Sequence, residues 1–269
     1  MRERFTIEGF LTVEWRLTTP SLPQPSGWQL CAARDSDEDP DGGRLGTMSA
    51  AVSLARPGPV FVIGRALLRP LLKLRFRPVI RGADRIPDSG PVLLASNHLA
   101  GLDTVLIPSF STRKVQFLAK ESLFKRGLLG WFFRQIGAIP VHRGAGSVAQ
   151  AALDAGRAVL ADGQVFAVFP EGSRSRDGRL YRGRGGAAWM ALATGATVIP
   201  VGLIGTNRRL RNPRTGRAPR VEVRFGAPVE LADLADLPSG RARREATARI
   251  MAAIHALTGQ ELAEGYAQH

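Results

Sequence analysis

Residues 91–103 read PVLLASNHLAGLD and set the architecture of this chain. Pro91–Ser96 is a short, continuous apolar run, the pattern of a strand that is covered on both faces of a sheet. The sequence then turns polar at Asn97 and His98, and again at Asp103. A buried strand that ends in a polar turn is typical of an open α/β sheet, in which functional groups gather at the carboxyl ends of the strands.

The same pattern recurs along the chain. Further apolar runs predict strands over residues 115–119, 138–141, 164–169 and 197–204, and strict alternation predicts one over 220–225. Helical patterns lie between and after them, over residues 148–161, 186–193 and 241–257. We therefore expect an α/β fold with a single, largely parallel, mixed sheet flanked by helices.

The charge of the chain is unevenly distributed. The 269 residues carry a net charge of +14, of which residues 1–47 contribute −3 and residues 48–269 contribute +17. Residues 1–47 also contain a Pro/Ser stretch and an acidic run, which are compositions of disordered chain. We expect residues 1–47 to be a disordered extension or a mis-assigned start before Met48, residues 48–78 to be a basic amphipathic helical segment, and residues 79–269 to be a single α/β domain. The single cysteine excludes a disulfide framework.

The segment Val60–Arg77 alternates apolar and basic residues. No uncharged run in it approaches the length of about 18 residues that a membrane span requires. Arg65, Arg69 and Lys73 are four residues apart and share one face of a helix, which Pro70 is expected to interrupt. This face either lies on an anionic membrane surface or is the solvated side of a helix that packs on its own domain.

His98 and Asp103 are five residues apart, so they do not meet on a regular helix. Across a strand-to-helix turn, however, Asp103 can fold back onto His98, fix its tautomer and stabilise the imidazolium that forms on proton abstraction. Such a pair acts as a general base towards a hydroxyl group. The alternative is a polar turn in which Asn97 and Asp103 only cap a helix.

Cations follow three of the predicted strands, at Lys120, Arg143 and Arg174. The carboxyl ends of parallel strands lie along one edge of a sheet, where these side chains suit a phosphate monoester. The alternative for each arginine is a solvated surface charge.

Four motifs in order carry a resemblance to a known family. They are Asn97-His98 with Asp103, Gly137-x-Ile139 with Arg143, the run Phe169–Ser175, and Val198–Val201. Over roughly residues 75–230 the chain resembles the glycerolipid acyltransferases, specifically the 1-acyl-glycerol-3-phosphate (lysophosphatidate) acyltransferases. Two positions differ from the family pattern: Ala100 stands where Ser is frequent, and Ser173 where Thr is usual.

The resemblance implies a glycerol-3-phosphate acyltransferase-like fold and an O-acyltransferase of phospholipid biosynthesis. It makes residues 79–269 the acyltransferase catalytic domain and residues 48–78 a helical segment that associates with a membrane. It implies that His98, held by Asp103, activates the sn-2 hydroxyl of lysophosphatidic acid, and that acyl-CoA or acyl carrier protein donates the acyl group to give phosphatidic acid. We expect no metal and no cofactor besides this co-substrate, and a location on the cytoplasmic face of the bacterial cell membrane, peripheral or monotopic, against an anionic surface. The residues expected to bind substrate are Asn97, Lys120, Arg143, Glu171, Gly172, Ser173 and Arg174.

Two other functions compete with this one. The first is an acyltransferase of the same superfamily with another acceptor, such as a lyso-ornithine lipid, a glycolipid or another lysophospholipid. The second is a nucleic-acid-binding protein, suggested by the basic charge and the arginine cluster at residues 208–214. Because aromatic residues make up only 7% of the chain and no nucleic-acid motif is present, no nucleic-acid partner is expected.

Overall fold

A computed structural model describes residues 59–120, 124, 125, 127, 137–141, 147–207 and 220–267. The predicted extension over residues 1–47 and the arginine cluster at 208–214 lie outside the described residues. So does Arg143, while Lys120 is described by its backbone alone.

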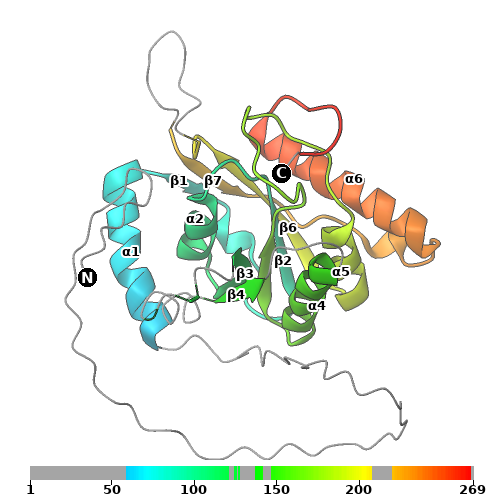
Figure 1. Cartoon of the computed structure of the whole chain (residues 1–269), viewed down its shortest axis with the longest axis horizontal. Helices are drawn as coiled ribbons and strands as arrows, with labels where there is room; N and C mark the ends of the chain where they lie inside the picture. The colour runs from blue at the N-terminus through cyan, green and yellow to red at the C-terminus, as the bar shows by residue number, and fades with distance from the viewer. Residues whose placement is uncertain are drawn as a thin grey trace, which may run out of the picture. The chain divides into compact units, whose positions relative to one another are not determined.

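The strands form one sheet with the order β1-β7-β6-β2-β5-β3-β4 (Figure 1). Their bounds are Val79–Arg81 for β1, Val92–Ser96 for β2, Val115–Lys120 for β3, Ala138–Val141 for β4, Val165–Val168 for β5, Thr197–Ile204 for β6 and Glu222–Phe225 for β7. All five predicted apolar runs are strands, whereas β1 was not predicted.

Five neighbouring strands are parallel: β6, β2, β5, β3 and β4. β7 runs antiparallel to β6, and β1 runs parallel to β7. The prediction of a largely parallel, mixed sheet is therefore confirmed. Because β2 and β5 are parallel neighbours, the polar segments that follow them lie at the same edge of the sheet.

Three helices cover one face of the sheet: α4 (Ser147–Ala161), α5 (Gly186–Thr194) and α6 (Ser239–Thr258). They pack on one another and on β2, β5 and β6, and they enclose a core that includes Leu93, Phe166 and Ile250. The predicted helices are confirmed, with α6 beginning two residues before the expected start. Short helical turns over Ala83–Arg85 and Ala232–Leu234 complete the connections.

The other face is covered by α2 (Asp103–Phe110), with α1 (Pro59–Phe76) packed beside it (Figure 1). The expectation that Pro70 interrupts α1 is wrong, because the helix continues through it. Packing accounts for this, since Leu72 and Phe76 are buried beyond the proline while Arg65 and Arg69 bind α2 before it. Within the described part of the chain, no helix combines the length and the apolar character needed to cross a bilayer.

The basic residues of α1 do not all face outward. Arg65 Nη1 donates to the backbone oxygen of Ser111 at 3.0 Å, and Arg69 Nη2 reaches the same oxygen at 3.2 Å. Arg69 Nε also donates to the backbone oxygen of Ser109. The sequence left Arg65 and Arg69 either on a membrane surface or in solvent, whereas in the structure both fasten α1 to the carboxyl end of α2.

Candidate active site

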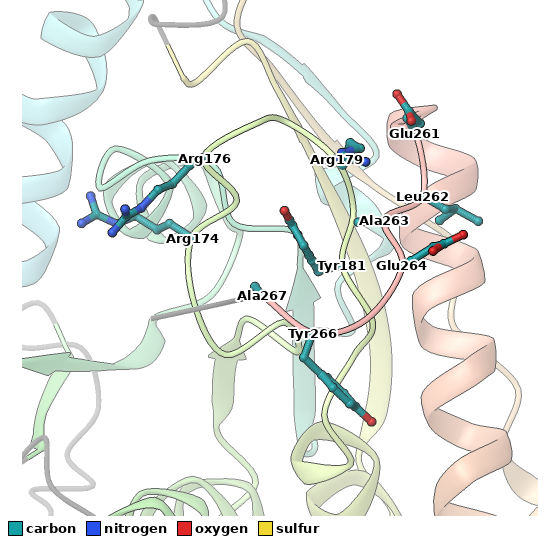
Figure 2. A pocket seen from close by; sticks show the side chains of 10 residues that line it. All are labelled: Arg174, Arg176, Arg179, Tyr181, Glu261, Leu262, Ala263, Glu264, Tyr266 and Ala267. Carbon is teal, nitrogen blue, oxygen red and sulfur yellow. The ribbon is translucent and has the colours of Figure 1, made fainter.

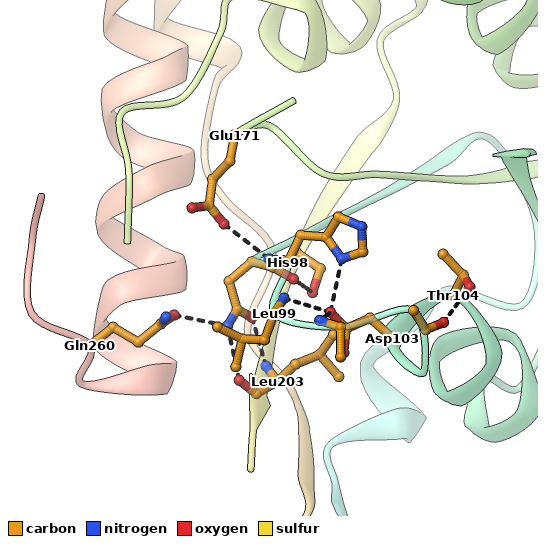
Figure 3. A network of polar contacts seen from close by, with 11 residues as sticks. His98, Leu99, Asp103, Thr104, Glu171, Leu203 and Gln260 are labelled. Carbon is orange, nitrogen blue, oxygen red and sulfur yellow. Dashed lines mark hydrogen bonds and ion pairs between the residues drawn. The ribbon is translucent and has the colours of Figure 1, made fainter. Parts of the chain in front are cut away.

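His98 and Asp103 meet in the turn between β2 and α2. His98 Nδ1 lies 2.9 Å from Asp103 Oδ2, and the Asp103 side chain is fully buried while that of His98 is 15% exposed (Figure 3). The carboxylate can only accept, so the proton lies on Nδ1 and the Nε2 lone pair remains available. This is the tautomer that a general base requires.

Asp103 also shapes the turn that carries His98. Its Oδ2 accepts the backbone N–H groups of Leu99 at 2.6 Å and of Ala100 at 2.8 Å. Ala100 contributes only its backbone here, so the absence of a hydroxyl at this position leaves the contact intact. The alternative of a helix cap without a role at His98 does not account for the direct contact between the two side chains.

Asn97 is fully buried and is used by the fold. Its amide exchanges two hydrogen bonds with the backbone of Leu203, at 2.9 and 2.8 Å, and donates to Gln260 Oε1 at 2.8 Å. Asn97 therefore anchors the turn between β2 and α2, which carries His98, to β6 and to the segment after α6. It was predicted to contact substrate, but its burial gives it a positioning role instead.

The loop after β5 supports His98 from a second direction. The Phe169 ring stacks on the imidazole with centroids 3.8 Å apart and an angle of 12° between the planes. Glu171 accepts the backbone N–H of His98 at 2.9 Å and that of Tyr181 at 3.0 Å, and its side chain is fully buried. Burial raises the pKa of Glu171 to about 7, against the lowering effect of these two hydrogen bonds.

Comparisons with known proteins match part of this chain to a family. Residues 77–204 match the sequence model of the Acyltransferase family. These residues form an acyltransferase domain. Over 130 residues the chain is 32% identical to the chloroplastic 1-acyl-sn-glycerol-3-phosphate acyltransferase LPAT1 of Arabidopsis thaliana. Over 148 residues it is 30% identical to the 1-acyl-sn-glycerol-3-phosphate acyltransferase of Borreliella burgdorferi.

These alignments cover 48% and 55% of this chain, and 36% and 59% of the two relatives, so the chain spans between about a third and three-fifths of their length. The chain also shares its fold with the crystal structure of the 1-acyl-sn-glycerophosphate (LPA) acyltransferase PlsC from Thermotoga maritima. That match has a TM-score of 0.57 at 23% identity and covers 73% of this chain and 79% of the other.

Of the remaining predicted site residues, Gly172, Ser173 and Arg174 are described in full, and they lie in the loop after β5. Arg174 is exposed in the loop after β5, close to the catalytic turn, because Ser175 next to it donates its N–H to the His98 oxygen at 2.7 Å. Gly172, at φ +78°, donates its N–H to the Phe169 oxygen at 3.0 Å, so this amide is used within the turn rather than offered to phosphate or oxyanion. Ser173 is half-buried between them.

Sequence reasoning missed two contributors to this site. Phe169 was quoted within a motif but given no role, since a ring after a strand is ordinarily part of the core. No contact of Gln260 was predicted. It accepts from Asn97 and donates to the Gly178 oxygen at 2.7 Å, across more than 80 residues of sequence. Nothing local in the sequence around Gln260 indicates either contact.

Proposed function

We propose that the protein acylates the free sn-2 hydroxyl of lysophosphatidic acid, with acyl-CoA or acyl carrier protein as the donor. The observation that carries this proposal is the His98–Asp103 pair, oriented and partly accessible, inside an acyltransferase domain. The names of the relatives support lysophosphatidate as the acceptor.

The chemistry follows from the available lone pair. His98 Nε2 removes the proton from the acceptor hydroxyl, whose oxygen attacks the thioester carbonyl and forms a tetrahedral intermediate. As this collapses, the carbon–sulfur bond breaks, and the departing thiolate takes the proton from the imidazolium. Asp103 stabilises the imidazolium between these steps. The products are phosphatidic acid and a free thiol, and His98 is regenerated.

The test uses the full chain with radiolabelled acyl-CoA or acyl carrier protein and lysophosphatidic acid, measuring thiol release and phosphatidic acid formation. Removal of a general base costs about 10²–10⁴-fold in rate, so His98→Ala should lose at least about 100-fold in kcat. His255→Ala, a histidine on α6 that takes no part in the dyad, is the matched control. Equal rates for His98→Ala and wild type would contradict the mechanism. Full activity on acceptors without phosphate would move the assignment to another lyso-lipid.

The proposal includes the place where the protein works, on the cytoplasmic face of the bacterial cell membrane and held there as a peripheral or monotopic protein. A lipid acceptor resides in the bilayer, and α1 presents an exposed apolar surface. Its members are more than half exposed, which is unusual for large apolar side chains on one helix. We call this surface the α1 apolar row: Val62, Ile63, Leu67, Leu71 and Leu74.

A further inference from the structure

An exposed patch of three arginines and one tyrosine lies beside the loop after β5. The guanidinium carbons of Arg182 and Arg184 lie over the Tyr266 ring, 5.9 and 5.6 Å from its centroid. A Cβ atom on Gly185 would lie 3.2 Å from Arg243 Cδ, so α6 brings a third arginine next to Arg184. All four side chains are exposed, that of Tyr266 by 54%. We call them the Tyr266 patch: Arg182, Arg184, Arg243 and Tyr266.

The positive charge of the Tyr266 patch is not neutralised by neighbouring carboxylates. None of its three arginines takes part in an ion pair among the residues that the structure describes. Glu261 and Glu264 belong to the same segment as Tyr266, but their side chains point away from its ring (Figure 2). The patch therefore suits an anionic partner.

The patch is fixed close to the turn that carries His98. Arg184 N–H donates to the Pro170 oxygen at 2.7 Å, and the next residue, Glu171, accepts the N–H of His98 at 2.9 Å. A Cβ atom on Gly172 would lie 2.8 Å from Arg184 Nε, so this arginine side chain lies across the loop after β5. A partner on the patch would therefore be held beside the proposed base.

The patch and the α1 apolar row lie on different sides of the molecule. The segment that carries the first two arginines packs on α6, because a Cβ atom on Gly183 would contact Thr247 and Met251. α6 belongs to the helices that cover one face of the sheet, whereas α1 and α2 cover the other (Figure 1). A bilayer that holds the α1 apolar row thus leaves the patch to a partner from the aqueous phase.

The openness and the composition of the patch indicate a protein partner rather than a small molecule. Small-molecule sites enclose most of the surface of their ligand. Of the four described side chains, however, only Tyr266 lines the cavity of about 580 Å³ beside the patch (Figure 2). Tyrosine and arginine are enriched at protein interfaces, where they supply much of the binding energy. Outside α1, the exposed large apolar side chains of the described residues are Tyr266 and Leu262.

Of the two donors in the proposed function, acyl carrier protein is the one that is itself a protein, and it is acidic. Its surface would complement the patch in charge, and its thioester arm would start beside the turn that carries His98. Resting on the proposed function, we propose that the Tyr266 patch is the docking surface for acyl carrier protein.

The experiment compares Arg182→Glu/Arg243→Glu with wild type in the full chain, on acyl carrier protein and on coenzyme A loaded with the same acyl group. Because like charges facing each other across an interface weaken association, kcat/KM for the loaded carrier protein should fall by at least about tenfold, and that for acyl-CoA by less than about twofold. Retained activity on acyl-CoA also shows that the variant is folded. The matched control is Arg157→Glu/Arg241→Glu, at two exposed arginines outside the patch, of which Arg241 lies about 200° from Arg243 around the axis of α6.

Equal losses on both donors, or an equal loss in the control variant, would overturn the assignment. So would weaker binding of Arg182→Glu/Arg243→Glu to anionic vesicles at unchanged kcat/KM for the carrier protein, because the patch would then contact lipid. Calorimetric binding of acyl carrier protein to the His98→Ala chain, with and without the patch substitutions, needs no turnover and so separates the two proposals. Binding that the patch substitutions weaken supports the surface even if no acyl transfer is detected. If the intact patch binds no carrier protein, the surface is refuted even in an enzyme that is active with acyl-CoA.

Discussion

Glu171 places an ionisable group where two backbone amides need an acceptor. Only the carboxylate can accept strongly from His98 and Tyr181 with separate oxygens, yet burial favours the neutral acid. The pKa is raised from 4.5 to about 7. Between these two pH values the folded state therefore keeps a proton on Glu171 that the unfolded state has released. The free energy of unfolding contributed by this residue therefore falls as pH rises through that window and is lowest above it.

Glu171→Gln should remove this pH dependence. Denaturant unfolding of wild type and variant at about pH 5 and about pH 8 should show wild type losing stability relative to the variant as pH rises. The variant should also lose about tenfold or more in kcat, since an amide can accept only one of the two N–H groups and leaves the other against a donor. Glu230→Gln, at an exposed glutamate, is the control. If the difference in unfolding free energy between wild type and Glu171→Gln were the same at both pH values, this account would be wrong.

The Phe169 ring stacks face to face on the imidazole of His98, the proposed base. Phe169→Leu keeps an apolar side chain but removes the stacked ring. Such aromatic contacts are worth about 0.5–1.5 kcal/mol, so kcat should fall by about 2–12-fold with little change in the KM for lysophosphatidate. Phe169→Tyr, which retains the ring, should restore the rate. A change confined to KM would show that Phe169 contacts substrate instead of orienting His98.

Among the elements, the segment after α6 acts as a brace for the loop after β5. Leu180 N–H donates to the Glu261 oxygen at 2.8 Å, Ala263 N–H to the Leu180 oxygen at 2.9 Å, and Arg182 N–H to the Gly265 oxygen at 3.0 Å. Gln260 joins this brace to the catalytic turn through Asn97 (Figure 3). The loop that carries Arg174 and the turn that carries His98 are therefore held at a fixed separation by a third segment.

Gln260→Leu should let the loop after β5 move relative to the turn that carries His98, without unfolding the protein. Asn97 keeps its two bonds to Leu203, so the variant should fold, while the KM for lysophosphatidate should rise by about tenfold for the loss of the bonds to Asn97 and Gly178. Gln150→Leu on α4 is the matched control, since the Gln150 amide donates only to exposed Asp154 among the described contacts. An unchanged KM with reduced thermal stability would make Gln260 a purely structural residue.

The strands and the His98–Asp103 pair could be predicted from the sequence, whereas contacts between distant segments could not. Continuous apolar runs predicted β2, β3, β4, β5 and β6, because a strand that is buried on both faces consists of consecutive apolar residues. The dyad was predictable because its members are close in sequence and belong to a motif. The inward orientation of Arg65 and Arg69 was not, since a four-residue spacing defines a face without showing what it contacts. The contacts of Gln260 could not be predicted either, because its partners Asn97 and Gly178 are distant in the sequence.

At the scale of the whole molecule, the apolar and basic faces of α1 have opposite tasks. Arg65 and Arg69 fasten the helix to the carboxyl end of α2, and α2 begins at Asp103. The α1 apolar row is left outward, with Leu67 at 64% and Leu74 at 77% exposure. One short helix, α2, thus joins this row to the His98–Asp103 pair. Docking through the row, as proposed, would orient the site as well as concentrate the protein at its lipid substrate.

The variant Leu67→Glu/Leu71→Glu should therefore abolish vesicle binding. Burial of a leucine side chain is worth about 1.5–3 kcal/mol, so losing two weakens partitioning to anionic vesicles by about a hundredfold or more in sedimentation. Leu262→Glu, at a leucine of similar exposure outside α1, should leave binding intact. Arg65→Gln/Arg69→Gln should instead lower the thermal stability of the domain, because its bonds to the end of α2 are lost. Vesicle binding that survives the leucine changes but is lost with the arginine changes would restore the basic face as the docking surface.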